Sequence, residues 1–61
     1  SSDLDSTAAI SVYLTERDRL LEEIAAVESG VAPASKDKLQ QMHRRLEELS
    51  RLIAENTEGD A

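Results

Sequence analysis

Apolar residues recur along this chain at steps of three and four, in two runs separated by a short break that contains glycine and proline. This spacing places the apolar residues of each run on one face of an α-helix. We expect the residues on these faces and beside them to make the contacts between helices and with a partner. They are Ile10, Tyr13, Leu14, Leu20, Leu21, Ile24, Val27, Leu39, Met42, Leu46, Leu49, Leu52 and Ile53. The pattern predicts an all-α fold, a hairpin of two antiparallel helices.

The first helix is expected at 7–29, after a polar lead-in at 1–6, with Asp5 or Ser6 as its N-cap. A second helix-start signal, with the spacing of a capping box, follows at Thr15. The alternative is therefore a helix that breaks just before this residue. The apolar stripe continues through this region without a change of phase. We therefore favour one continuous helix.

Gly30 is expected to end the first helix, because glycine readily adopts the left-handed conformation found after helix C-termini. A loop at 30–35 follows, and Ser35 is a suitable N-cap for a second helix at 36–55. The remaining residues, 56–61, are small, polar and acidic, and we expect a flexible tail there. The short connection makes the two helices antiparallel neighbours.

Four pairs of opposite charge at i,i+4 spacing support the predicted helices, each by about 0.2–0.5 kcal/mol. They are Arg19–Glu23, Arg44–Glu48, Glu47–Arg51 and Arg51–Glu55. These pairs lie mainly on the polar faces, so they indicate helix formation and do not identify a partner.

The 61 residues form one small domain, and chains of this size need a further source of stability such as disulfides, a metal or oligomerisation. The chain has no cysteine and one histidine, so we expect oligomerisation. Leu14, Leu21 and Leu52 make both apolar faces wider than a contact between two helices requires. We predict that the hairpin pairs with a second copy into an antiparallel four-helix bundle.

The charge balance restricts the classes of partner. Thirteen acidic and seven basic residues give a formal charge of −6, and the basic residues are interleaved with acidic ones. Nucleic acids and anionic membranes attract clustered positive charge, so we expect neither as a partner. No apolar run approaches the roughly 20 residues of a membrane span. Together with the lack of cysteine, this favours a cytoplasmic protein.

The sequence also offers no set of residues suited to catalysis or metal binding. It has no cysteine nucleophile, and its lone histidine, His43, cannot form a zinc site of several Cys and His ligands. Glu22 and Glu23 occupy adjacent helical positions that do not face one another, and no Glu-x-x-His pattern of di-metal bundles is present. We expect no enzyme activity and no cofactor, and we interpret His43 as a solvated side chain and not as a proton switch.

Arg17 stands where the heptad spacing of the first run calls for an apolar residue. In one interpretation, this charge fixes the register or the oligomeric state at some cost in stability. In the other, the apolar stripe drifts, and Arg17 lies at its margin with its stem covering apolar surface. We favour the second interpretation.

Two segments together form a pattern known from one family: DRLLEEIAAV at 18–27 and LQQMHRRLEELSR at 39–51. They resemble the dimerising helical hairpin in the C-terminal docking domains of modular polyketide synthases. The resemblance implies an intertwined four-helix bundle, built from two helices of each of two chains, that holds synthase subunits together. The family usually has an aromatic residue near the end of the second helix, where this chain has Leu52 and Ile53.

We therefore expect a non-catalytic association module, whose partners are a second copy of itself and another protein of a larger assembly. An alternative of a different class is a free-standing helical hairpin that acts as a chaperone or regulatory protein and binds a helix of an unrelated target. The first hypothesis predicts a homodimer. The alternative predicts a stable monomer, or a weak dimer that gives way to a one-to-one complex.

Overall fold

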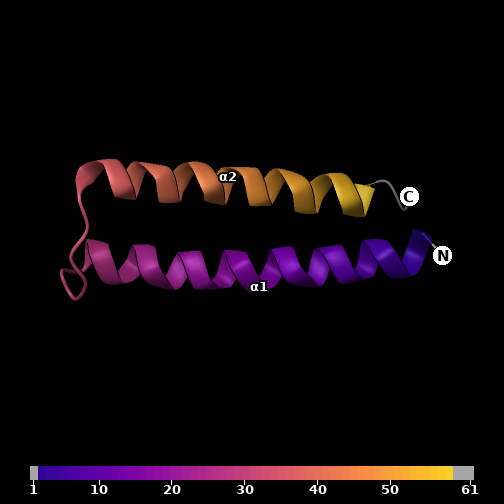
Figure 1. The fold of residues 1–61 in the computed structure, drawn as a ribbon, viewed down its shortest axis with the longest axis horizontal. Helices are drawn as coiled ribbons and strands as arrows, with labels where there is room; N and C mark the ends of the chain where they lie inside the picture. The colour runs from indigo at the N-terminus through magenta and orange to yellow at the C-terminus, as the bar shows by residue number, and fades with distance from the viewer. Residues whose placement is uncertain (1, 59–61) are drawn as a thin grey trace.

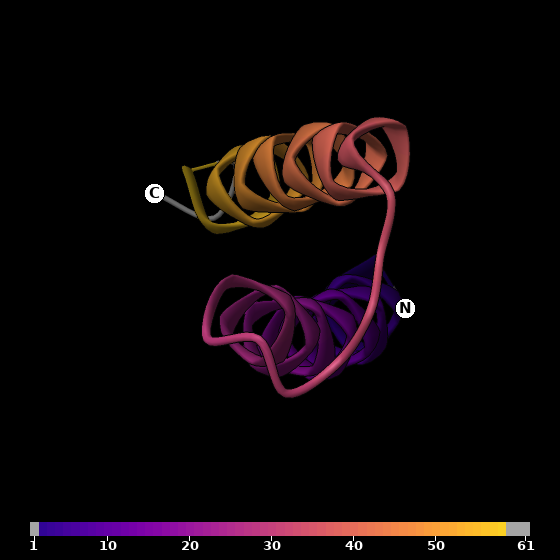
Figure 2. The same ribbon diagram turned by 90° about the vertical axis from the view of Figure 1, so that its left-hand side faces the viewer.

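The computed structural model describes residues 2–58, with side chains described for residues 7–57. Two helices, α1 (Ser2–Glu28) and α2 (Lys36–Glu58), make up almost all of this part of the chain. They run antiparallel, joined at one end by a loop at 29–35 (Figure 1). Seen from the loop end, the two helices lie side by side in a single layer (Figure 2). The predicted all-α hairpin is confirmed.

α1 begins at Ser2, earlier than the sequence pattern predicts. The expected N-cap at Asp5 or Ser6 is therefore wrong, and the lead-in expected at 1–6 is helical from Ser2 onward, while Ser1 lies outside the described residues. The sequence of this stretch includes two aspartates, a residue type favoured in the first turn of a helix. It contains neither glycine nor proline, so nothing in it delays the start of the helix.

α1 also passes Thr15 without a break. The Thr15 hydroxyl donates a hydrogen bond of 3.0 Å to the backbone carbonyl of Ser11, one turn earlier in the same helix. This is the bond that a threonine makes inside a helix, and it replaces the capping bond that a new start would need. The expectation of one continuous helix is confirmed.

The end of α1 follows the expectation for Gly30. This glycine has a φ of 84°, and its N–H donates to the carbonyl of Val27 at 3.1 Å. The N–H of Val31 donates to the carbonyl of Ala26 at 2.9 Å. The two bonds form a Schellman motif, in which the left-handed glycine lets the chain reverse and satisfy the last carbonyls of the helix.

α2 begins as the sequence predicts, with Ser35 as its N-cap. The Ser35 hydroxyl oxygen accepts a hydrogen bond of 3.1 Å from the N–H of Lys38. The carbonyl of Ser35 accepts the first helical bond, from Leu39 at 3.0 Å. The first of these contacts satisfies the N–H of Lys38, one of the donors that a helix start otherwise leaves without partners.

α2 continues to Glu58, beyond its predicted end at residue 55. The tail expected at 56–61 is therefore helical as far as Glu58, and its remainder lies outside the described residues. Asn56 and Thr57 each donate a side-chain hydrogen bond to the backbone carbonyl four residues earlier, at 2.7 and 3.0 Å. These polar side chains thus satisfy their hydrogen-bond donors on the helix backbone itself, so the polar sequence is compatible with a helix here.

The core between the helices is small. Among the described side chains, the buried apolar ones are Ile24 of α1 (5% exposed) and Met42 and Leu49 of α2 (6% and 0%). All three belong to the predicted apolar faces. One helix packed against another encloses only the middle of each face, so the flanks of both faces stay in contact with water.

Candidate protein-interaction surface

The structure leaves most of the predicted contact residues partly exposed. Apart from the three core residues, the side chains are half-buried at Ile10, Tyr13, Leu14, Leu20, Val27, Leu39, Leu46, Leu52 and Ile53. Leu21 is exposed, with 46% of its surface in contact with water. Contact between α1 and α2 therefore uses only part of the apolar surface that the sequence provides.

Two contacts between the helices distinguish the two long sides of the hairpin. Arg45 Nε donates to Glu16 Oε2 at 2.7 Å, and His43 Nε2 lies 3.8 Å from Glu28 Oε2. Because each residue advances by about 100° around a helix, Glu16 and Glu28 lie on opposite sides of the buried Ile24. The first contact therefore marks one side of the hairpin, and the second marks the other.

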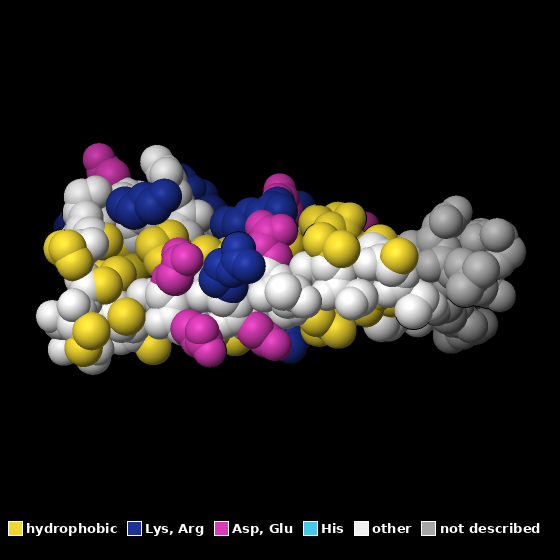
Figure 3. Space-filling view, turned by 60° about the horizontal axis from the view of Figure 1, so that its bottom comes forward, with side chains coloured by type: hydrophobic (Ala, Val, Ile, Leu, Met, Phe, Trp, Pro, Cys, Tyr) yellow, Lys and Arg dark blue, Asp and Glu magenta, His cyan; other side chains and the backbone are white. Residues whose placement is uncertain are grey.

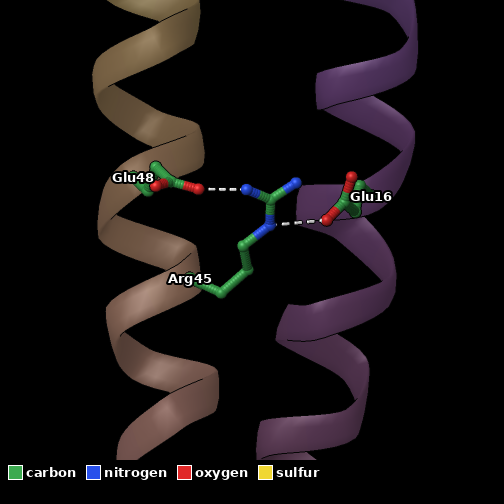
Figure 4. Close-up of polar contacts among 3 residues, drawn as sticks. All are labelled: Glu16, Arg45 and Glu48. Atoms are coloured by element: carbon green, nitrogen blue, oxygen red, sulfur yellow. Dashed lines mark hydrogen bonds and ion pairs between the residues drawn. The ribbon is translucent and has the colours of Figure 1, made fainter.

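The first side carries a charged triad, which consists of Glu16, Arg45 and Glu48. Arg45 reaches from α2 toward α1, and its guanidinium bonds to Glu16 through Nε and to Glu48 through an Nη atom (Figure 4). The hydrogen bond from Arg45 lowers the pKa of Glu16 below its ordinary value. The two carboxylates in turn raise the pKa of Arg45. The triad thus joins the two helices by charge-assisted hydrogen bonds on this side.

The second side carries an apolar edge, made of two rows of aliphatic side chains on the flank marked by Glu28 and His43. The residues of the apolar edge are Ile10, Leu14 and Leu21 of α1 and Leu39, Leu46 and Ile53 of α2. None of them is buried in the hairpin. The α1 row has one seven-residue step and the α2 row has two, and such steps keep side chains on nearly the same line along a helix. The two antiparallel helices therefore present two adjoining aliphatic rows to one side.

The two sides also differ in what separates their apolar residues. Leu20, Val27 and Leu52 lie half-buried on the side of the charged triad. Along α1 the triad's Glu16 precedes Leu20, and along α2 Arg45 and Glu48 precede Leu52. The apolar residues of this side thus lie beside three charged side chains, whereas the apolar edge has Arg17 at its inner margin and Glu28 and His43 near its loop end.

Arg17 lies between the core and the apolar edge. Its side chain is 36% exposed, and its Nη2 lies 3.6 Å from Asp18 Oδ1. Within the described part of the chain, its Nε is buried and has no hydrogen-bond partner. The half-buried stem fits a position at the margin of the apolar stripe, and both interpretations of its role stay predictions.

His43 is half-exposed, as expected for a residue beside the second apolar face, with 50% of its side chain in contact with water. Its contact with Glu28 joins the two helices, and no spacing within either helix indicates it. No group of three or more His, Asp or Glu side chains suited to holding a metal is found in the part of the chain that the structure describes.

Of the four ion pairs expected within the helices, Arg51–Glu55 is present, with 3.8 Å between Nε and Oε1. Glu48 pairs with Arg45, three residues earlier, and not with Arg44 as the i,i+4 spacing suggested. The contact with Glu16 across the helices holds the Arg45 guanidinium within reach of Glu48, so a tertiary contact decides which arginine is used.

A shallow hollow of about 480 Å³ lies on α1 beside the charged triad. It is lined by Ser11, Val12, Thr15, Glu16 and Arg19. All of these residues come from one helix, so the hollow lacks the convergent groups from several elements that mark a small-molecule site. Val12 is 61% exposed there; it lies off the apolar stripe, and sequence reasoning did not single it out.

The outer surface alternates between charge and apolar area. In the view of Figure 3, acidic and basic side chains crowd the middle of the molecule, and apolar side chains gather toward the loop end and again beyond the charged band. Near the loop, Val31 is 81% exposed. The charged band thus divides the apolar surface seen in this view into two parts.

Comparison with protein-family models, curated proteins and solved structures finds no match for this chain. Functional inference therefore rests on the residues themselves. Neither helix contains, within the described residues, a stretch long and apolar enough to cross a membrane.

Proposed function

We propose that this chain is a non-catalytic, homodimerising association module that holds subunits of a larger assembly together. The observation that carries this proposal is the size of the core. Among the side chains of residues 7–57, those that are apolar and buried are Ile24, Met42 and Leu49, which are few for a chain without cysteine. Domains of this size usually gain their remaining stability from a metal, a disulfide or a partner, and a second copy supplies a partner.

The exposed flanks of the helices support the arrangement that we propose for the dimer. Two hairpins that bring their flanks together form a four-helix bundle, in which side chains half-buried in one hairpin become enclosed by the other. Leu21, at 46% exposure, and Leu14 would move from water into this shared core. The helices of each hairpin are antiparallel, so an antiparallel bundle requires no change in the hairpin itself.

The larger assembly is proposed from the resemblance of residues 18–27 and 39–51 to the docking domains of modular polyketide synthases. In this proposal the module acts in the cytoplasm and joins synthase-like subunits. The gene around the segment tests this part. A multidomain synthase in the same reading frame would support it, and an independent gene for this hairpin would contradict it.

Sedimentation equilibrium over about a hundredfold range of concentration tests the dimer, together with thermal unfolding followed by circular dichroism. We expect a helical dimer whose unfolding midpoint rises with concentration. A helical monomer with a constant midpoint would contradict the proposal. It would favour a hairpin that binds a helix of an unrelated target.

A further inference from the structure

We propose that the second copy of this chain binds along the apolar edge, with its own apolar edge, and that the side of the charged triad stays at the outside of the dimer. The inference rests on the proposed function and specifies which side of the hairpin performs it. The apolar edge comprises Ile10, Leu14, Leu21, Leu39, Leu46 and Ile53.

The surface area of the hairpin indicates how much a partner has to cover. The chain exposes 4566 Å², whereas a compact monomeric protein of its size exposes about 3,900 Å². The excess is about 650 Å² by the same relation. A standard protein–protein interface buries about 800 Å² on each partner. The excess surface of one hairpin thus approaches what a stable dimer needs from each of its copies.

The shape of the hairpin indicates the direction from which a second copy approaches. The molecule measures 43 × 15 × 14 Å, and its radius of gyration is 13.9 Å, against about 10.5 Å for a compact domain of this length. A copy added end to end would lengthen this rod and cover little of its surface. A copy added along a long side covers the most surface, and it makes the molecule more compact.

Charge decides between the two long sides. On the side of the triad, Arg45 and Glu16 have side chains 41% and 37% exposed, and a docked copy would remove them from water together with Glu48. Desolvating such charges opposes association. The residues of the apolar edge are aliphatic, and their burial favours association. Arg17 lies at the inner margin of this edge with its side chain 36% exposed, so a docked copy has to accommodate this charge, against the three charges of the triad on the other side.

The apolar edge also suits a second copy better than an unrelated protein, because it matches itself. In a two-fold symmetric dimer the same patch lies on both partners. The edge has aliphatic rows with seven-residue steps on both helices, at Leu14 and Leu21 and at Leu39, Leu46 and Ile53. The rows of one copy can therefore pack between the rows of the other, as in helix bundles.

Two matched substitutions on α1 test this inference in the full chain. Leu21→Glu places a carboxylate on the apolar edge, and Val12→Glu places one on the other side, at a residue that is also exposed (46% and 61%). We expect Leu21→Glu to raise the dimer dissociation constant about a hundredfold or more, because association then takes an additional charge out of water, and an ion pair with Arg17 one turn earlier does not remove that cost. Val12→Glu should leave it within about threefold, as expected for a surface substitution. Sedimentation equilibrium measures both constants.

Cysteine substitutions at the same two residues keep the test informative if Leu21→Glu unfolds. The chain has no cysteine of its own, so a single introduced thiol reports its position by its rate of alkylation. We expect the thiol of Leu21→Cys to react more slowly as the protein concentration rises through the dissociation constant. The thiol of Val12→Cys should react at the same rate at every concentration.

The outcomes separate this inference from the proposed function. If the unmodified chain dimerises, but Leu21→Glu dimerises as well as Val12→Glu and both thiols are equally reactive, the apolar edge is not the interface and the association module stands. If Val12 proves to be the protected residue, the dimer uses the opposite side. If the unmodified chain is monomeric at every concentration, the proposed function and this inference both fail.

Discussion

Arg45 of α2 and Glu16 of α1 form a hydrogen-bonded ion pair across the hairpin, with 2.7 Å between Nε and Oε2. The two residues are 29 positions apart in the sequence, so the pair forms only when the helices pack in one particular register. The pair is therefore present only in the folded hairpin, and its contribution to stability depends on pH.

The stability that Glu16 provides should be lost in acid. Its pKa is lowered, mainly by the hydrogen bond from Arg45, below its ordinary value of 4.5. A group with a lowered pKa in the folded state stabilises the fold above its unfolded pKa, and this contribution disappears as the pH falls through the folded pKa. We expect Glu16→Gln to lower the unfolding temperature at pH 7, and the difference from the unmodified chain to vanish well below pH 4.5.

Thermal unfolding by circular dichroism between neutral and acidic pH measures this difference. Glu22→Gln is a suitable control, because it removes the same charge from an exposed position of α1. Acid reduces the net negative charge of all variants alike, so the comparison isolates the pair. A pH-independent difference between Glu16→Gln and the unmodified chain would contradict the role assigned to Arg45.

Leu49 is the most deeply buried of the described residues, at 0% exposure. Leu49→Ala should lower the free energy of unfolding by about 2–5 kcal/mol, the usual effect of removing a large aliphatic side chain from a core. This is a large fraction of the stability of so small a domain. Val12→Ala, at an exposed residue, should change the stability little. Urea unfolding of both variants makes the comparison, and equal effects would contradict the assignment of Leu49 to the core.

Arg17→Leu should stabilise the protein. The substitution removes a buried Nε that has no hydrogen-bond partner among the described residues, and such a group costs about 1–3 kcal/mol. The substitution also removes the ion pair with Asp18. That pair is largely exposed, with 70% of the Asp18 side chain in water, so its removal has little effect on stability.

Urea unfolding and sedimentation equilibrium of Arg17→Leu separate the two interpretations of this residue. A more stable protein with unchanged oligomeric state supports a position at the margin of the apolar stripe. A mixture of oligomeric states would show that Arg17 sets the register or the number of copies, as charged residues in coiled coils do.

Gly30→Ala should lower the free energy of unfolding by about 1–2 kcal/mol, the cost of a left-handed conformation for a residue with a Cβ atom. The φ of Gly30 is 84°, and an added Cβ would meet no atom within 4 Å. The effect should therefore come from the backbone conformation alone. Gly30→Asn is the control, since asparagine adopts this conformation more readily, and its loss of stability in urea unfolding should be the smaller of the two.

The features that the sequence predicts correctly are those encoded within a few residues. Gly30 and Ser35 each act through hydrogen bonds to backbone groups nearby, so their roles follow from residue type and position. The spacing of apolar residues within each helix likewise encodes its buried face, which includes Ile24 on α1 and Met42 and Leu49 on α2. Helix ends without a glycine, such as the start of α1 at Ser2, depend on a balance of weak preferences that no single residue reveals.

The contacts between the helices were beyond prediction because they depend on register and rotation. Neither the pairing of Arg45 with Glu16 nor that of His43 with Glu28 follows from spacing along one helix. The same missing information prevented the sequence from assigning Leu21 to one side of the hairpin and Val12 to the other. Once the register is known, helical geometry places both residues.

The loop closed by Gly30 and Ser35 also determines how the molecule responds to dilution. Because only a short segment separates the helices, α1 meets α2 at an effective concentration in the millimolar range, whatever the concentration of the protein. In the proposed dimer, a second copy has no such tether. Dilution then weakens the contact between copies without changing the effective concentration at which α1 meets α2, so any dependence of the stability on protein concentration comes from the second copy alone.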